Sequence, residues 1–427
     1  MSSSHDLTDD AFETLTGADG AAEGLDGTAQ EAEAANGLRH AASLSMTKVA
    51  DGLIDPKLVL SWLLTSLGAP AVYAGALVPI REAGALLPQI LYAGWVSSLR
   101  QRRWAWVLGS AGQGTAAAAI VFFALTLEGA AAGLAICGAL AVLALSRAMC
   151  SVSYKDILGK TVGQSRRGAI TGLAGSVSSV GVLIFAGLLI SGLLESRGAV
   201  IAAIGLAAAL WALAAVLFST ITEVDSEPDG SLAASFDVLR DNPVLWRFIV
   251  VRGLLVSTAL APPYFVILGG GEDASALGQL GALVLASALA SFVSSYIWGR
   301  FADISSRRVL MLTGVIGALA MLLAVGLALA GLAQAVWAMP GALFVLMVAY
   351  NGVRQGRSTY LVDISPADRR AAYAAVCNTV IGALLLVAGL AGGGAALFGP
   401  QAVLVLFALM AVAAAVAAYG LPEAEDG

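Results

Sequence analysis

The chain consists of long apolar runs separated by short polar segments. Most of the runs are about as long as an α-helix must be to cross a bilayer, roughly 20 residues. No segment alternates apolar and polar residues as the strands of a membrane barrel do. The pattern predicts an all-α integral membrane protein with twelve transmembrane helices. We place them at 48–67, 71–97, 104–126, 130–154, 168–193, 199–220, 245–268, 275–299, 309–331, 336–357, 371–395 and 400–420.

The polar segments at the start and in the middle of the chain divide it into parts. Residues 1–47 hold nine acidic residues and almost no large apolar ones, so we expect a disordered acidic cytoplasmic tail. The acidic stretch 221–244 separates the spans six and six, which predicts a linker between two six-helix bundles. The bundles then cover 48–220 and 245–421, and a short cytoplasmic tail follows at 422–427.

Composition and charge support this assignment. Hydrophobic residues make up 59% of the chain and charged residues 12%, against roughly 25% charged residues in soluble domains. Of the basic loop residues, fourteen fall on one side of the predicted bundles and Arg197 alone falls on the other. The positive-inside rule places both termini and the linker in the cytoplasm, with the protein in the cell inner or plasma membrane. The fourteen are Arg100, Arg102, Arg103, Lys155, Lys160, Arg166, Arg167, Arg240, Arg247, Arg300, Arg307, Arg308, Arg369 and Arg370.

The sequence offers little for catalysis or metal binding. Cys137, Cys150 and Cys377 lie in apolar segments without disulfide or metal spacing, and His5 and His40 are confined to the tail. No nucleophile elbow, phosphate-binding loop, dinucleotide fingerprint or zinc helix is present. We therefore expect no enzyme activity, cofactor, metal or nucleic-acid partner.

A short motif recurs in the two halves. Residues 299–308 read GRFADISSRR, with Gly299, Asp303, Arg307 and Arg308 at relative positions 0, +4, +8 and +9. The first half has GWVSSLRQRR, in which Gly94, Arg102 and Arg103 match and Ser98 replaces the aspartate.

This motif resembles the loop between the second and third spans of each half in the major facilitator superfamily, G-x-x-x-D-[RK]-x-G-[RK]-[RK]. Ile304 and Ser306 depart from that pattern, and no subfamily is indicated. The resemblance implies two pseudo-symmetric bundles that rock about a central site, with these loops as a cytoplasmic gate. The alternative is that the basic residues only anchor the topology.

The position of Arg81 and Glu82 follows from the repeat. Aligning Gly94 with Gly299 places the start of the second span near Ala71, so Gly68–Pro70 becomes an outside turn. Arg81 and Glu82 then lie inside the second span, near mid-membrane. Hydropathy alone also permits spans at 56–80 and 83–99, with the pair in an outside loop.

Several other charged residues fall inside or beside predicted spans. A charge at the bilayer centre costs roughly 2.5–3.5 kcal/mol, so such residues usually line a water-filled path or pair with one another. We leave closed ion pairs as the alternative to a solute or proton path. In the superfamily the first, fourth, seventh and tenth spans line the cavity, which favours the path. The candidates are Asp51, Asp55, Lys57, Arg81, Glu82, Arg147, Arg252, Arg354 and Arg357.

These features predict a secondary active transporter that moves a small organic solute by alternating access. The excess of basic candidates favours an anionic solute, and Glu82 and Asp55 are candidate proton carriers. We expect a monomer in the lipid bilayer whose partners are the solute and protons. The alternatives are an exporter of lipophilic compounds and, in a different class, a non-transporting membrane scaffold or sensor.

Overall fold

The computed structural model describes residues 2–16, 25, 27–163, 166–191, 193, 196–227, 242–270, 275–365 and 370–423. Within these residues the secondary structure is helical and contains no strand, which confirms the all-α class. The helices are α1 (Ser2–Thr16), α2 (Gly27–Glu31), α3 (Glu33–Leu53), α4 (Val59–Ser66), α5 (Ala71–Leu86), α6 (Gln89–Ser97), α7 (Arg103–Thr126), α8 (Gly129–Thr161), α9 (Arg167–Ile190), α10 (Arg197–Ser219), α12 (Pro243–Leu255), α13 (Ser257–Leu260), α14 (Pro262–Gly269), α15 (Ser275–Leu329), α16 (Ala338–Asp363), α17 (Arg370–Ala396) and α18 (Pro400–Tyr419).

The helices fall at the positions of the predicted spans. The first span is broken into α3 and α4, the second into α5 and α6, and the seventh into α12, α13 and α14. The eighth and ninth are continuous in α15 except for an extended residue, Ser305 (φ −165°, ψ 103°). Among the residues that the structure describes, eight helical segments are long and apolar enough to cross a membrane. The first, second, eighth and tenth carry charges, breaks or short apolar stretches, and their crossing stays a prediction.

The start of the chain differs from the expected disordered tail. Helix α3 begins at Glu33, well before the predicted boundary at 48, and α1 and α2 are also helical. The expectation of disorder is therefore wrong for residues 27–47, while 17–24 lie outside the described residues. Composition shows few large apolar residues here, but buried polar contacts and an apolar cluster that includes Phe12, Leu38 and Ala41 hold the segment against the first half.

Three polar side chains of α3 make these contacts with the rest of the first half. Glu33 pairs with Arg166 at 3.0 Å. Asn36 exchanges two 2.9 Å hydrogen bonds with the backbone of Thr222. His40, fully buried, lies 2.8 Å from the Thr161 hydroxyl.

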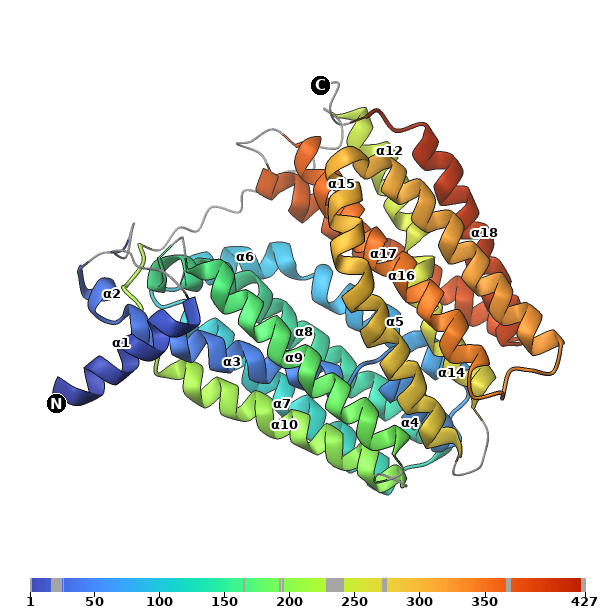
Figure 1. Cartoon of the computed structure of the whole chain (residues 1–427), viewed down its shortest axis with the longest axis horizontal. Coiled ribbons are helices and arrows are strands. Elements are labelled where there is room, and N and C mark those ends of the chain that lie inside the picture. Colours follow the sequence, from blue (N-terminus) through green and yellow to red (C-terminus); the bar gives the residue numbers. More distant parts are fainter. Residues whose placement is uncertain are drawn as a thin grey trace.

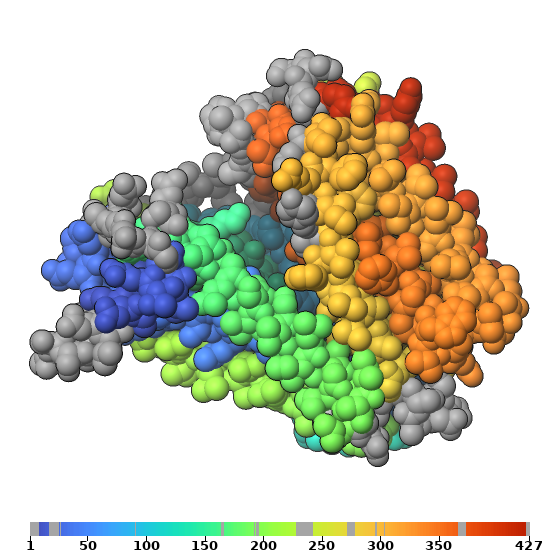
Figure 2. All heavy atoms as spheres, viewed as in Figure 1, coloured from blue at the N-terminus to red at the C-terminus, as the bar shows by residue number. Residues whose placement is uncertain are grey.

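Figure 1 shows that the two halves meet at one end and diverge toward the other. We call the end with the Gly68–Pro70 turn and the N-terminus of α15 the closed end. The open end carries the C-terminus of α6 and the start of α12, and Figure 2 shows this face hollowed between the halves. The contacts between the halves run mainly between α5 and α17 and between α9 and α15.

Glycines allow the closed-end contacts to be tight. A Cβ at Gly281 would lie 2.8 Å from Ile190 Cγ1 and 2.9 Å from Leu189 Cβ. A Cβ at Gly389 would lie 2.4 Å from Pro79 Cγ. These separations are shorter than non-bonded carbon contacts allow, so a side chain at either position must push the halves apart.

The closed end can be tested by cross-linking. In a variant without the three native cysteines, Leu189→Cys with Gly281→Cys should form a disulfide on mild oxidation. The two Cβ atoms would start 2.9 Å apart, so the separation of the halves that the new side chain forces brings them toward the roughly 3.8 Å of a disulfide. Leu183→Cys with Gly281→Cys is the matched control, since position 183 lies about 9 Å back along α9. Equal cross-linking of the two pairs would contradict the helix register at this end.

Candidate functional site

The break between α3 and α4 fixes the position of Asp55. Pro56 cannot continue the α3 hydrogen-bond ladder. The Asp55 carboxylate accepts hydrogen bonds from the backbone N–H groups of Lys57 (2.7 Å) and Leu58 (3.1 Å), as a cap does at the start of a helix. Asp55 therefore caps the turn that precedes α4 (Val59–Ser66), and within the described residues it forms no ion pair with Arg81.

Asp51 lies between two arginines. One carboxylate oxygen accepts a hydrogen bond from Arg81 at 2.8 Å, and the other accepts one from Arg147. We call these three residues the aspartate triad. It joins α3, α5 and α8, so it links the first, second and fourth spans. Arg81 lies in the middle of α5 and is buried, which confirms that the Arg81–Glu82 pair is inside a helix; the alternative of an outside loop is wrong.

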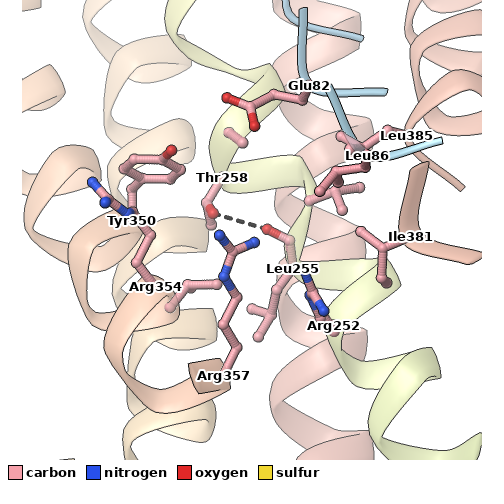
Figure 3. Close-up of a pocket in the computed structure, with 13 residues that line it drawn as sticks. Glu82, Leu86, Arg252, Leu255, Thr258, Tyr350, Arg354, Arg357, Ile381 and Leu385 are labelled. Carbon is pink, nitrogen blue, oxygen red and sulfur yellow. Dashed lines mark hydrogen bonds between the residues drawn. The ribbon is translucent and has the colours of Figure 1, made fainter. Parts of the chain in front are cut away.

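Glu82 points away from the triad and lines a cavity at the junction of the two halves. The second half contributes Arg252 from α12 and Tyr350, Arg354 and Arg357 from α16. Figure 3 shows Glu82 facing the cavity from one side while the Arg357 and Arg252 side chains reach it from the other. The cavity has a volume of about 60 Å³. It is smaller than ordinary ligand pockets of roughly 300–1,000 Å³, so a solute needs the adjoining space between the halves.

The charges of this central cavity are not balanced. Arg252 donates hydrogen bonds to Cys377 Sγ (3.0 Å) and Asn378 Oδ1 (2.9 Å) of α17. Within the described residues, Glu82, Arg354 and Arg357 form no ion pair within 4 Å. Three guanidinium groups thus face a single carboxylate. The closed ion pairs left open by the sequence occur in the triad but not in this cavity.

Lys57 links the two halves beside the cavity. Its Nζ lies 3.7 Å from the centroid of the Tyr350 ring, within the range of a cation–π contact. Tyr350 could not be singled out from the sequence, because a contact between the first and tenth spans depends on how the bundles dock.

The first-half loop motif contacts acidic residues of its own half. Arg102 pairs with Asp156 at 2.5 Å. The backbone N–H groups of Arg102 and Arg103 donate to the Glu223 carboxylate at 3.1 and 2.8 Å. Burial raises the pKa of Glu223, and these two hydrogen bonds oppose the shift. Gly94 lies in α6, near the end of the second span.

The second-half motif repeats this arrangement. Arg307 and Arg308 reach the Glu423 carboxylate at 2.7 and 3.6 Å. Glu423 follows the end of α18 by four residues, as Glu223 follows the end of α10. This equal spacing is present in the sequence and could have identified Glu223 and Glu423 as the partners of the two loop motifs. Gly299 lies in α15, and the side chain of Asp303 is outside the part of the chain whose side chains are described.

Similar proteins agree with this architecture. The family model of the Major Facilitator Superfamily matches residues 256–427. No curated protein sequence matches the chain.

Solved structures with the same fold include three transporters. The nucleoside transporter NupG has a TM-score of 0.66 at 14% identity, covering 90% of this chain and 98% of its own. A D-xylose-proton symporter has a TM-score of 0.65 at 14% identity, covering 92% and 99%. The POT family transporter PepTSo has a TM-score of 0.66 at 13% identity, covering 90% and 97%.

The fold is that of an all-α membrane protein built from two related bundles. The resemblance to the Major Facilitator Superfamily is confirmed by the family model for residues 256–427, and the solved structures share the fold over 90–92% of the chain. No subfamily is identified.

The different roles of Asp51 and Asp55 can be separated by substitution. Asp51→Asn removes the charge between two guanidinium groups and should destabilise the protein by about 1–3 kcal/mol, less than a fully buried pair because Arg147 is partly exposed. Asp55→Asn is the matched control, since asparagine caps a helix as well as aspartate does. Thermal unfolding in detergent measures both. Equal losses would mean that the triad does not stabilise the first half.

Proposed function

We propose that this protein is a secondary transporter that binds a small organic anion in the central cavity. The observation that carries the proposal is the excess of guanidinium groups where the two halves meet. Arginine can offer a carboxylate or phosphate two parallel hydrogen bonds, so it suits an anionic solute. The similar structures named above belong to transporters of nucleosides and D-xylose and to a POT family protein, which supports transport without indicating this solute.

The orientation follows from the basic residues. The loops at the open end carry nearly all the basic loop residues of the chain, so we assign this end and both termini to the cytoplasm. The structure then corresponds to a state open to the cytoplasm. Transport requires the contacts of α9 with α15 and of α5 with α17 to separate while the cytoplasmic ends come together.

The loop motifs fit a gate in this cycle. Arg102 and Arg307 each pair with acidic residues of their own half while the cytoplasmic end is open. When the end closes, these pairs can rearrange against the other half. Gly94, Arg103, Gly299, Asp303 and Arg308 complete the proposed gate.

Glu82 is the preferred proton carrier. It lines the central cavity and directly follows Arg81 of the triad. Asp55 is less suited, because its carboxylate already accepts two backbone hydrogen bonds. Loss of a proton from Glu82 would add a negative charge beside the arginines and so weaken the binding of an anion.

A second candidate function is export of lipophilic compounds. A groove of about 940 Å³ lies between the break after α3 and helices α9 and α15. Its lining includes Val182, Leu183, Leu289 and Phe292, and Phe292 is 82% exposed. A lipophilic compound could enter through this groove, and its transport would tolerate loss of the central arginines. A scaffold or sensor without transport is the remaining alternative, and it predicts no solute change at all.

Solute profiling tests the anion assignment. Cells that make the wild-type protein should differ in one or more organic anions from cells that make Arg354→Gln or Arg357→Gln at equal membrane abundance. Arg197→Gln is the matched control, because Arg197 lies at the closed end, where it donates to the Ser66 carbonyl at 3.2 Å and is 4.0 Å from Glu128. A change confined to lipophilic compounds that persists in both cavity variants would instead support the exporter.

Proton coupling is tested in vesicles with an imposed pH gradient, using the anion found by profiling. Glu82→Gln cannot release a proton, so it should abolish accumulation while leaving exchange of the solute across the membrane. Asp55→Asn should retain accumulation, since its cap is preserved. If Glu82→Gln still accumulates solute and Asp55→Asn does not, the carrier is Asp55.

A further inference from the structure

A second cavity lies wholly inside the first half, apart from the central one. It has a volume of about 250 Å³ and is an open pocket lined by residues of α3, α7 and α8. Arg147 and Asp51 of the triad belong to its lining. Within the described residues, no side chain of the second half lines it. The polar and aromatic lining includes Lys48, Gln113, Tyr154, Lys155 and Trp106.

Two polar groups in the lining have unused hydrogen-bonding capacity. Gln113 is 2% exposed, and its Nε2 donates to the Gly109 carbonyl (3.3 Å) and to Cys150 Sγ (3.5 Å). Gln113 Oε1 and the Tyr154 hydroxyl have no hydrogen-bond partner among the described residues. A buried polar atom without a partner costs about 1–3 kcal/mol. Both residues line the cavity, and a rotation of either side chain would turn its buried, unpartnered atom toward a ligand.

The charges around the cavity favour an anion. Arg147 and Lys155 contribute two cations, and Lys48 contributes a third whose ammonium group also donates to the Thr171 carbonyl of α9 at 3.2 Å. Asp51 contributes the single carboxylate. Asp51 also shares its charge with Arg81 outside the cavity. The Arg147 side chain is 40% exposed, so part of its guanidinium is free of Asp51 and open to a ligand. Lys155 lies at an exposed position of α8.

Besides a negative charge, a ligand of this cavity needs a neutral hydrogen-bond donor. Gln113 Oε1 is an acceptor, so it needs an O–H or N–H group from the ligand. An ammonium group would add a positive charge to a cavity that already has an excess of cations. A hydroxyl satisfies Gln113 without that cost, and the Tyr154 hydroxyl can donate to a carboxylate oxygen.

We propose that this cavity is a second binding site, for a small hydroxy acid. The carboxylate lies between Arg147, Lys155 and the Tyr154 hydroxyl, and the ligand's hydroxyl donates to Gln113 Oε1. The site does not depend on the central cavity or on the transport of its solute. A bound carboxylate shares Arg147 with Asp51, so occupancy of this site acts directly on the aspartate triad.

The test uses the purified full-length protein in detergent and two probes, L-lactate and propionate, which differ by one hydroxyl. Saturation-transfer NMR titrations should give a lower Kd for lactate. Gln113→Met keeps a similar side-chain volume but removes the acceptor. It should weaken lactate binding about three- to tenfold, since it removes one hydrogen bond, and leave propionate binding unchanged.

Two further variants identify the site. Lys155→Gln, at an exposed position that does not threaten folding, should weaken both acids. Arg357→Gln alters only the central cavity and should leave the preference for lactate over propionate intact. The proposal is overturned if the wild-type protein does not distinguish the two acids, or if Arg357→Gln removes the preference while Gln113→Met and Lys155→Gln do not. Either result leaves the transport proposal to be judged separately by solute profiling.

Discussion

The arrangement of the first half depends on how Asp51 is neutralised. A lone carboxylate within a membrane helix is costly, and removing one partner of a buried ion pair leaves an uncompensated charge. Arg81 and Arg147 bring two guanidinium groups to this one carboxylate from separate helices. The triad therefore holds the first, second and fourth spans in one register. The break after α3 lets the next segment start afresh at the Asp55 cap, so Lys57 can reach Tyr350 in the other half.

Because an unpaired charge within the membrane is costly, the charges that lack a close partner point to sites with a function. In the central cavity three arginines face Glu82 alone, and in the second cavity, inside the first half, three cations face Asp51. Structural ion pairs would have been closed, as those of Arg102, Arg307 and Arg308 are. The unbalanced groups of the central cavity lie where the two halves meet, which is where water and solutes have access. Structure and charge thus separate the groups that hold the bundles together from those proposed to bind ligands.

The sequence predicted the helices well because their apolar runs are long and the two halves repeat. The repeat also placed Arg81 and Glu82 inside a helix when hydropathy alone left two possibilities. The partners of these charges were harder to predict. Asp51 and Asp55 look equivalent in sequence, and only the backbone break makes one a pair member and the other a cap. Lys57 and Tyr350 meet only because the bundles dock. Residues 27–47 are ordered by polar contacts and by apolar packing around Phe12, neither of which composition reveals.

If the central cavity binds a solute, its three arginines, Arg252, Arg354 and Arg357, must be in contact with water that is open to the cytoplasm. Ala259, a small residue that lines the central cavity, can be changed to cysteine in a variant that lacks the three native cysteines. Its reaction with a membrane-impermeant thiol reagent would be measured in vesicles of each orientation. We expect the cysteine at position 259 to be modified rapidly from the cytoplasmic side and to be protected from the outside. Protection from both sides would contradict it, because the charges would then belong to a closed, dry core.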